Sequence, residues 1–306
     1  MTGHSPPLAH CGHVALIGRP NAGKSTLLNR ILGQKISITS RKPQTTRHRI
    51  LGIKTTERSQ VIYVDTPGLH RSTGRRVINR LMNRAALDAL QDVDVVLLLA
   101  DELRWGKEED FVLARLRRCR RPVVLAINKV DRIKPRERLL PHIEMLGSLH
   151  PFADIVPISA RSGRNVALLE ERLAALLPAS PPLFPEDQVT DRSERFLAAE
   201  LVREKLMRRL GQELPYALAV EVERFVLEGK GERDMLRIHA LIWVERPAQK
   251  SIVIGHQGRV LKAVGQQARL DMERLFGRKV FLHLWVKVKE KWSDDERALR
   301  SLGYAE

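Results

Sequence analysis

Short apolar runs alternate with helical patterns along the first 180 residues of this 306-residue chain, and this alternation constrains the fold most. Apolar runs without polar alternation are typical of strands buried on both faces, and helices between them imply a mostly parallel sheet. The runs lie at 14–17, 61–64, 93–100, 123–127 and 155–158, and the helical patterns at 25–32, 77–90, 111–118, 138–146 and 166–177. A strand over 49–54 is expected to pair with the second run at an edge. The sequence therefore predicts an α/β domain.

A proline-rich break ends this pattern. Four prolines lie within residues 177–185, and such a run predicts a stiff extended linker because proline cannot continue a helix. A helix over 192–210 follows, then two strands with alternating apolar residues, a helical stretch over 248–276 interrupted at 255–258, a third such strand and a helix over 294–302. We expect a tail at 1–12, an α/β domain at 13–178, a linker at 179–191 and an α+β domain at 192–306.

Residues 18–25 (GRPNAGKS) fit the phosphate-binding pattern GxxxxGK[ST], and they follow a strand and open a helix, as this motif requires. Glycines let backbone N–H groups wrap phosphates, Lys24 supplies a charge to the β- and γ-phosphates, and the Ser25 hydroxyl is expected to bind Mg²⁺. The residues expected to contact the nucleotide here are Gly18, Asn21, Ala22, Gly23, Lys24, Ser25 and Thr26.

Residues 65–68 (DTPG) end the second apolar run. Asp65 is expected to reach Mg²⁺ through water, and the Gly68 N–H to meet the γ-phosphate. This tetrapeptide is common in loops, so it gains weight only from its place at the end of a strand.

Residues 128–131 (NKVD) end the fourth run, and 159–161 (SAR) end the fifth. Guanine presents two donors side by side, N1–H and the exocyclic amine, which one carboxylate such as Asp131 accepts together. Lys129 is expected to lie across the base and Asn128 to tie this loop to the phosphate loop. Ser159 and Ala160 complete the site, with the Ala160 N–H directed at the guanine O6. Adenine has no such donor pair, which argues against an ATPase or kinase.

The formal net charge is +17, which favours an anionic partner. Residues 1–180 carry 30 basic against 16 acidic side chains, and residues 181–306 carry 23 against 20. No apolar run approaches the ~20 residues of a membrane span, and the N-terminus lacks the apolar stretch of a signal peptide. We expect a cytoplasmic protein.

The chain resembles the bacterial Era GTPases over about residues 11–304. The resemblance lies in the four motifs at strand ends and in residues 44–48 (QTTRH), 63–70 (YVDTPGLH) and 284–289 (LWVKVK). The resemblance implies a P-loop GTPase domain followed by an α+β type II KH domain. It also implies a monomer that converts GTP to GDP and phosphate, binds the 3′ end of 16S-type ribosomal RNA and acts in assembly of the small ribosomal subunit. Such proteins are further described as peripheral at the inner face of the cell membrane.

The expected catalytic residues are Asn21, Lys24, Thr45, Thr46 and Gly68. Many GTPases orient the attacking water with a glutamine after the DxxG motif, but here that position is Leu69. In GTPases without this glutamine, an asparagine at the position of Asn21 commonly accompanies a bound K⁺, so K⁺ is expected besides Mg²⁺. The expected Mg²⁺ ligands are Ser25, Asp65 and one of Thr45 and Thr46.

Residues 255–258 (GHQG) lie between two helices, where glycines let a nucleic-acid backbone approach and helix N–H groups face phosphates. The expected RNA-binding residues are Ile252, Ile254, Gly255, His256, Gln257, Gly258, Arg259 and Lys262. A plain helix corner is the alternative for this tetrapeptide. The alternative for the whole chain is a signalling GTPase whose second domain binds protein or lipid. The odd face of the last strand, around Trp285, is either a second RNA surface or a solvated face.

Overall fold

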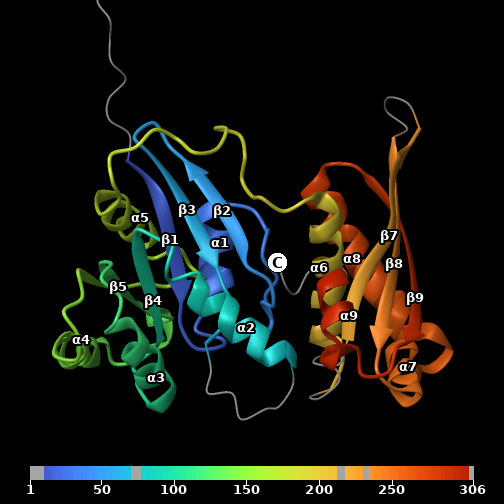
Figure 1. Ribbon diagram of the computed structural model, residues 1–306, viewed down its shortest axis with the longest axis horizontal. Coiled ribbons are helices and arrows are strands. Elements are labelled where there is room, and N and C mark those ends of the chain that lie inside the picture. Colours follow the sequence, from blue (N-terminus) through green and yellow to red (C-terminus); the bar gives the residue numbers. More distant parts are fainter. Residues whose placement is uncertain (1–9, 70–76, 212–217, 230–233, 303–306) are drawn as a thin grey trace, which may run out of the picture. The chain divides into compact units, whose positions relative to one another are not determined.

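The computed structural model describes residues 10–69, 77–211, 218–229 and 234–302 (Figure 1). The chain divides into two units, of which the first comprises residues 1–37, 46–73 and 82–191, and the second 38–45, 74–81 and 192–306. This division differs from the contiguous one expected, because two short stretches of the first 178 residues pack with the C-terminal part. Most of the expected tail, residues 1–9, lies outside the described residues, as do residues 70–76.

The first unit is built on a six-stranded sheet with the order β2-β3-β1-β4-β5-β6. Its strands are β1 (His10–Ile17), β2 (Ile50–Thr55), β3 (Ser59–Asp65), β4 (Val95–Asp101), β5 (Val123–Asn128) and β6 (Asp154–Pro157). Strand β2 runs antiparallel to β3 at one edge, and the other neighbours are parallel, which confirms the predicted sheet and its edge strand.

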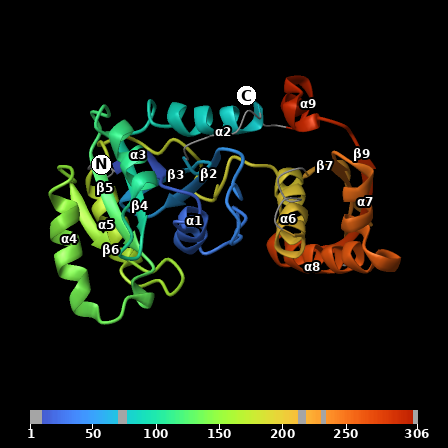
Figure 2. The same ribbon diagram turned by 90° about the horizontal axis from the view of Figure 1, so that it is seen from below.

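Helices cover both faces of this sheet (Figure 2). They are α1 (Lys24–Leu32), α2 (Val77–Asp88), α3 (Lys107–Leu116), α4 (Leu139–Gly147) and α5 (Val166–Ala175). Side chains of α2, α3 and α4, such as Ala86, Val112 and Leu146, form one core with the sheet. Helices α1 and α5 contact β1, β2 and β3. Because both faces are covered, β4 and β5 are buried at every residue, as their continuous apolar sequence predicts.

The proline-rich stretch and the rest of the expected linker at 179–191 belong to the first unit. The buried Gln60 side chain accepts hydrogen bonds from the backbone N of Leu183 and Phe184, at 2.7 and 2.9 Å, and donates to the Phe184 carbonyl at 2.8 Å. The Ile53 backbone N donates to the Val189 carbonyl at 2.8 Å. The edge of the sheet thus finds its hydrogen-bond partners in this stretch.

Strand β1 begins at His10, so the expected tail is three residues too long. The Cys11 backbone N donates to the Pro178 carbonyl at 3.1 Å, and the Cys11 side chain is buried. Because of this contact with Pro178, strand β1 begins before residue 14, where the apolar run that predicted the strand starts.

The second unit has a three-stranded sheet with the order β7-β8-β9. Its elements are α6 (Glu194–Arg209), β7 (Leu218–Glu228), β8 (Met235–Val244), α7 (Pro247–Ile254), α8 (Arg259–Phe276), β9 (Lys279–Val288) and α9 (Glu296–Ser301). Strand β8 pairs antiparallel with β7 and parallel with β9. Helices α6 and α8 pack on the face that carries the buried even positions of β8, which confirms the predicted alternation (Figure 1). Among the described residues, no helix is both long and apolar enough to cross a membrane.

Candidate functional site

The phosphate loop joins the end of β1 to the start of α1, as predicted. Gly18 and Gly23 have φ angles of 154° and 106°, which disfavour side chains. A Cβ on Gly18 would lie 2.6 Å from the Leu99 carbonyl, and one on Gly23 would lie 2.2 Å from the Asn128 amide nitrogen. The first turn of α1 contains no acidic residue. The loop therefore presents a helix N-terminus suited to an anion.

Lys24 is buried within this loop. Its Nζ donates to the carbonyls of Gly18, at 3.1 Å, and Arg19, at 3.2 Å. Burial lowers the pKa of Lys24 to about 8, and the charge of Asp65 opposes this shift. A bound phosphate would stabilise the charged ammonium, so this site favours anions.

Oxygen atoms gather beside Lys24 around Asp65. The Ser25 hydroxyl donates to Asp65 Oδ2 at 2.8 Å and lies 2.8 Å from the Thr46 hydroxyl, and Ser37 also donates to Asp65 at 2.8 Å. Burial raises the pKa of Asp65 despite the nearby Lys24. Asp65 Oδ1 is buried and has no hydrogen-bond partner in the described structure.

This oxygen cluster fits Mg²⁺. The ion is usually held by one or two carboxylates together with hydroxyls, waters and substrate phosphates, and not by an all-protein cage. The unpartnered Asp65 oxygen and the hydroxyls of Ser25 and Thr46 match that donor set. Accordingly, the described residues contain no group of three His, Cys, Asp or Glu side chains that could form such a cage.

The structure separates the two threonines that the sequence left as alternatives. Thr46 contacts Ser25, whereas the Thr45 hydroxyl donates to the Lys42 carbonyl at 2.7 Å and lies 2.7 Å from the Ser40 hydroxyl. Thr46 belongs to the first unit and Thr45 to the second.

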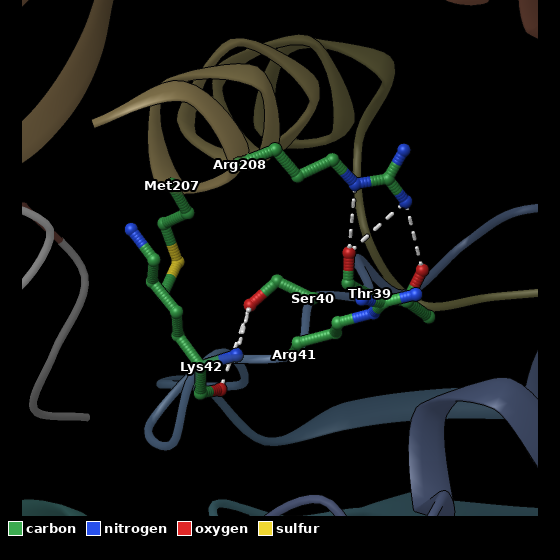
Figure 3. A pocket seen from close by; sticks show the side chains of 6 residues that line it. All are labelled: Thr39, Ser40, Arg41, Lys42, Met207 and Arg208. Atoms are coloured by element: carbon green, nitrogen blue, oxygen red, sulfur yellow. Dashed lines mark hydrogen bonds between the residues drawn. The ribbon is translucent and has the colours of Figure 1, made fainter. Parts of the chain in front are cut away.

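Within the second unit, helix α6 holds residues 38–45 with charged side chains that the sequence analysis missed (Figure 3). Glu204 accepts from the Thr39 backbone N at 2.9 Å, and Arg208 donates to the Thr39 carbonyl at 3.1 Å. The buried Arg203 donates to the Thr45 carbonyl at 2.6 Å and forms an ion pair with Glu200 at 2.6 Å.

A pocket of about 520 Å³ lies beside these contacts, lined by Thr39, Ser40, Arg41, Lys42, Met207 and Arg208. The Lys42 ammonium donates to the backbone carbonyl of Leu210 and to that of Gly211 at 3.2 Å. Three charged residues of α6 are buried at this contact: Glu200, Arg203 and Glu204. In the sequence they resemble ordinary exposed helix charges.

The remaining nucleotide motifs meet at Asn128. Its side-chain nitrogen donates to the Ala22 carbonyl at 2.8 Å, which confirms the predicted tie to the phosphate loop. Its oxygen accepts from the backbone N of Lys129, at 2.8 Å, and of Ala160, at 3.0 Å. The Ala160 N–H expected at the guanine O6 is therefore bonded to Asn128 in this structure.

Asp131 lies on the 3₁₀ turn that follows β5, where its side chain is exposed. A hydrogen bond from Ser159 lowers the pKa of Asp131. The carboxylate is therefore ionised at neutral pH and able to accept two hydrogen bonds.

Asp101, at the end of β4, is a further residue of this site that the sequence analysis missed. Its Oδ2 lies 2.9 Å from Arg19 Nη2 and 2.8 Å from Lys129 Nζ. Lys129 also donates to the Asn21 carbonyl at 3.0 Å. Asp101 thus joins the phosphate loop to the NKVD loop. The available signal was an aspartate directly after an apolar strand, at the same sheet edge as the motifs.

The DTPG loop places Gly68 against the phosphate loop, because a Cβ on Gly68 would lie 2.9 Å from the Pro20 backbone N. Leu69 is buried in the core on the face of α2 to α4. The side chain that stands where many GTPases have a glutamine is therefore committed to packing.

The GHQG loop lies between α7 and α8, as predicted. Gly255, Gln257 and Gly258 have φ angles of 72°, 50° and 74°. His256, Gln257, Arg259 and Lys262 are exposed, Ile254 is half-buried, and Ile252 is 51% exposed. Within the described structure no carboxylate pairs with Arg259 or Lys262. The loop thus offers cations and one apolar side chain to a ligand.

The open face of the small sheet differs from this loop in its electrostatics. Arg237 pairs with Glu228 at 2.7 Å, Lys287 lies 4.0 Å from Glu223, and Trp243 donates to Glu221 at 2.9 Å. Strand β7 thus supplies carboxylates to Arg237 and Lys287, whereas Lys289 lies over the Trp243 ring.

Comparisons with known proteins agree with this geometry. Residues 13–129 match the family of 50S ribosome-binding GTPases, and residues 213–293 match the KH domain family. GTPase Era of Pseudomonas aeruginosa strain LESB58 is 59% identical over 301 residues, which is 98% of this chain and 97% of the relative. GTPase Era of Pseudomonas savastanoi pv. phaseolicola is 59% identical over 296 residues, covering 97% of each.

A solved structure gives the same result. The crystal structure of Era in complex with MgGDPNP and nucleotides 1506–1542 of 16S ribosomal RNA is 39% identical, with a TM-score of 0.91, and the match covers 97% of this chain and 100% of that one. The nucleotide motifs, the KH domain and these identities together place the chain in the Era family of GTPases.

Proposed function

We propose that this GTPase acts as a switch that binds the 3′ end of small-subunit ribosomal RNA during assembly of the small ribosomal subunit. Two sites in one chain carry the proposal. One is a nucleotide site whose loops are joined by Asn128, and the other is a glycine loop beside Arg259 and Lys262, which have no carboxylate partner among the described residues. The related Era structure contains both MgGDPNP and a 16S ribosomal RNA fragment, which supports this pairing of sites.

In the proposed nucleotide site, Gly18, Ala22, Gly23 and Lys24 contact the phosphates. Ser25, Thr46 and Asp65 would hold Mg²⁺, directly or through water, and the ion would neutralise phosphate charge. Thr26, in the first turn of α1, also contacts the nucleotide. Gly68 donates to the γ-phosphate, and Asp131, Lys129, Ser159 and Ala160 surround the guanine.

The role of Thr46 can be tested against its neighbour. Thr46→Ala should raise the Mg²⁺ concentration for half-maximal hydrolysis by about tenfold, because a lost contact to a charged group costs about 1.5–3 kcal/mol. Thr46→Ser should restore the wild-type value. Thr45→Ala should leave the Mg²⁺ dependence within about twofold, since Thr45 contacts Ser40 and Lys42. A larger shift in the Thr45 variant would reverse the assignment.

Guanine specificity should rest on Asp131. In Asp131→Asn, the amide replaces an acceptor by a donor, so GTP affinity should fall by at least about tenfold on loss of one charged hydrogen bond. Xanthosine triphosphate, which carries an acceptor at that position, should bind more tightly than GTP. Glu137→Gln removes an exposed carboxylate nearby and is the matched control. Competition titrations measure both affinities, and unchanged GTP binding would refute the role.

Hydrolysis should be faster in K⁺ than in Na⁺ at equal ionic strength. Asn21 in the phosphate loop and the buried Leu69 motivate this proposal, since a cation near the phosphates would supply charge that no side chain at position 69 can. Asn21→Ala should abolish the difference between the salts, with a rate loss on the order of tenfold or more. GDP affinity should change little. Equal wild-type rates in both salts would exclude the K⁺ site.

RNA is proposed to bind at the loop of Gly255 to Gly258, with Arg259 and Lys262 facing phosphates and Ile252 and Ile254 beneath bases. By family resemblance we also propose a monomeric, cytoplasmic protein with peripheral contact to the inner face of the membrane.

The loop proposal predicts that replacing both His256 and Gln257 by Asp weakens RNA binding at least tenfold. Two repelled phosphate contacts cost about 1–3 kcal/mol each. Gln266→Asp with Gln267→Asp adds the same charge at exposed positions of α8 and should bind normally. Fluorescence anisotropy with a single-stranded RNA of the 3′-terminal sequence measures affinity. Basal GTPase activity should be unchanged, and equal affinity in the two double variants would overturn the role of the loop.

A further inference from the structure

Five arginines lie within seven residues at the end of α3: Arg115, Arg117, Arg118, Arg120 and Arg121. The last four are exposed in the segment that leads to β5. None of the five forms an ion pair with a carboxylate in the described part of the chain. Some other exposed arginines of this unit do: Arg84 pairs with Asp88 and Arg172 with Asp154.

The concentration of charge exceeds what the helix end requires. Cations in the last helical turn stabilise the helix dipole, which accounts for Arg115 and Arg117. Arg120 and Arg121 lie beyond the helix. The pKa of Arg115 is lowered by burial and by the charge of Arg118. The pKa of His150 is lowered by burial and by the charge of Arg117. Among the described residues, no carboxylate forms an ion pair that would relieve the repulsion between these arginines.

Four of these arginines, all but Arg117, line a hollow of about 760 Å³ between the ends of α2 and α3. Leu87, Leu90 and Gln91 line one side, and Arg118, Arg120 and Arg121 line the other. Arg115 lies over the Phe111 ring at 3.3 Å and donates to the Phe111 carbonyl at 2.9 Å. The side chains available to a ligand are therefore those of Arg117, Arg118, Arg120 and Arg121, which we call the arginine cluster.

We propose that the arginine cluster is a second RNA contact, which binds the phosphates of double-stranded RNA. This proposal rests on the proposed function, because it takes RNA as the partner. The arginine cluster itself lies in the GTPase unit and is separate from the GHQG loop. Arginine is favoured for this role because its planar fork binds phosphate oxygens in pairs.

The surroundings favour an RNA backbone over other anions. Single-stranded RNA is usually held by exposed aromatic rings that stack on bases, whereas Phe111 here lies under Arg115. Peripheral membrane binding requires apolar side chains that insert into lipid beside the cations. The exposed large apolar side chains of this unit lie elsewhere, on α4 and α5 and in the proline-rich stretch: Leu140, Met145, Leu168, Leu176 and Leu183. Duplex RNA, which is recognised through its phosphates, fits a cluster of guanidinium groups.

The test compares two triple variants of the full chain. One replaces Arg118, Arg120 and Arg121 by Gln, and the control replaces Arg136, Arg138 and Arg172, which removes the same charge elsewhere on the unit. Anisotropy with a blunt-ended RNA duplex of about 20 base pairs is measured across KCl concentrations. The first variant should bind at least tenfold more weakly, and its log–log salt slope should fall by about two to three, as expected for three lost phosphate contacts. GTPase rate and thermal unfolding should match wild type.

The variant with Asp at 256 and 257 separates this proposal from the proposed loop function. It should lose single-stranded RNA binding and keep duplex binding. Normal single-stranded binding in that variant would refute the loop but leave the cluster standing. Three results would overturn the cluster: no duplex binding by the wild type, an equal loss in the control triple, or loss of binding only to vesicles containing phosphatidylglycerol.

Discussion

The side-chain amide of Asn128 joins three loops of the nucleotide site, and the geometry of that site depends on it. The amide donates to Ala22 in the phosphate loop and accepts from Lys129 and Ala160 in the two loops that face the base. The asparagine amide offers donors and an acceptor on one short planar group. An aspartate would place an unpaired oxygen against the Ala22 carbonyl, in a position that is 2% exposed. Asn128 therefore fixes the phosphate and base halves of the site relative to each other, together with Asp101, which joins Arg19 to Lys129.

A second constraint acts on residues 38–46. Thr46 is bonded to Ser25 beside Asp65, and the preceding residues are bonded to α6 through Arg203, Glu204 and Arg208. The charged groups of α6 that make these bonds are largely buried, and a buried charge that loses its partner costs several kcal/mol. Since Thr45 and Thr46 share a peptide bond, the chain passes within one residue from a contact with α6 to the oxygen cluster proposed for Mg²⁺. Polar contacts thus hold this stretch in addition to the burial of Ile38.

The sequence predicted the sheet, its edge strand, the GHQG loop between two helices and the tie from Asn128 to the phosphate loop. These follow from local patterns, because apolar runs and motif spacing depend on nearby residues. The missed features depend on contacts between distant residues. Gln60 holds the proline-rich stretch from within a strand, and Asp101 joins Arg19 to Lys129 across two loops. No local pattern distinguishes Glu204, which is fully buried, from an exposed helix charge. The choice between Thr45 and Thr46 likewise needed coordinates.

Whether a basic side chain has a carboxylate partner indicates an RNA-binding surface better than the net charge of the chain does. Residues 181–306 carry nearly equal numbers of basic and acidic side chains. Some of these basic side chains have carboxylate neighbours and others do not. Arg237 and Lys287 on the open sheet face have carboxylate neighbours, whereas Arg259 and Lys262 beside the GHQG loop have none in the described structure. The first unit shows the same contrast between Arg172, paired with Asp154, and the arginine cluster. A paired cation gains little from a phosphate, because it must first give up its carboxylate, and an unpaired one releases repulsion when the phosphate binds. The two surfaces assigned to RNA are therefore those where the fold leaves positive charge uncompensated.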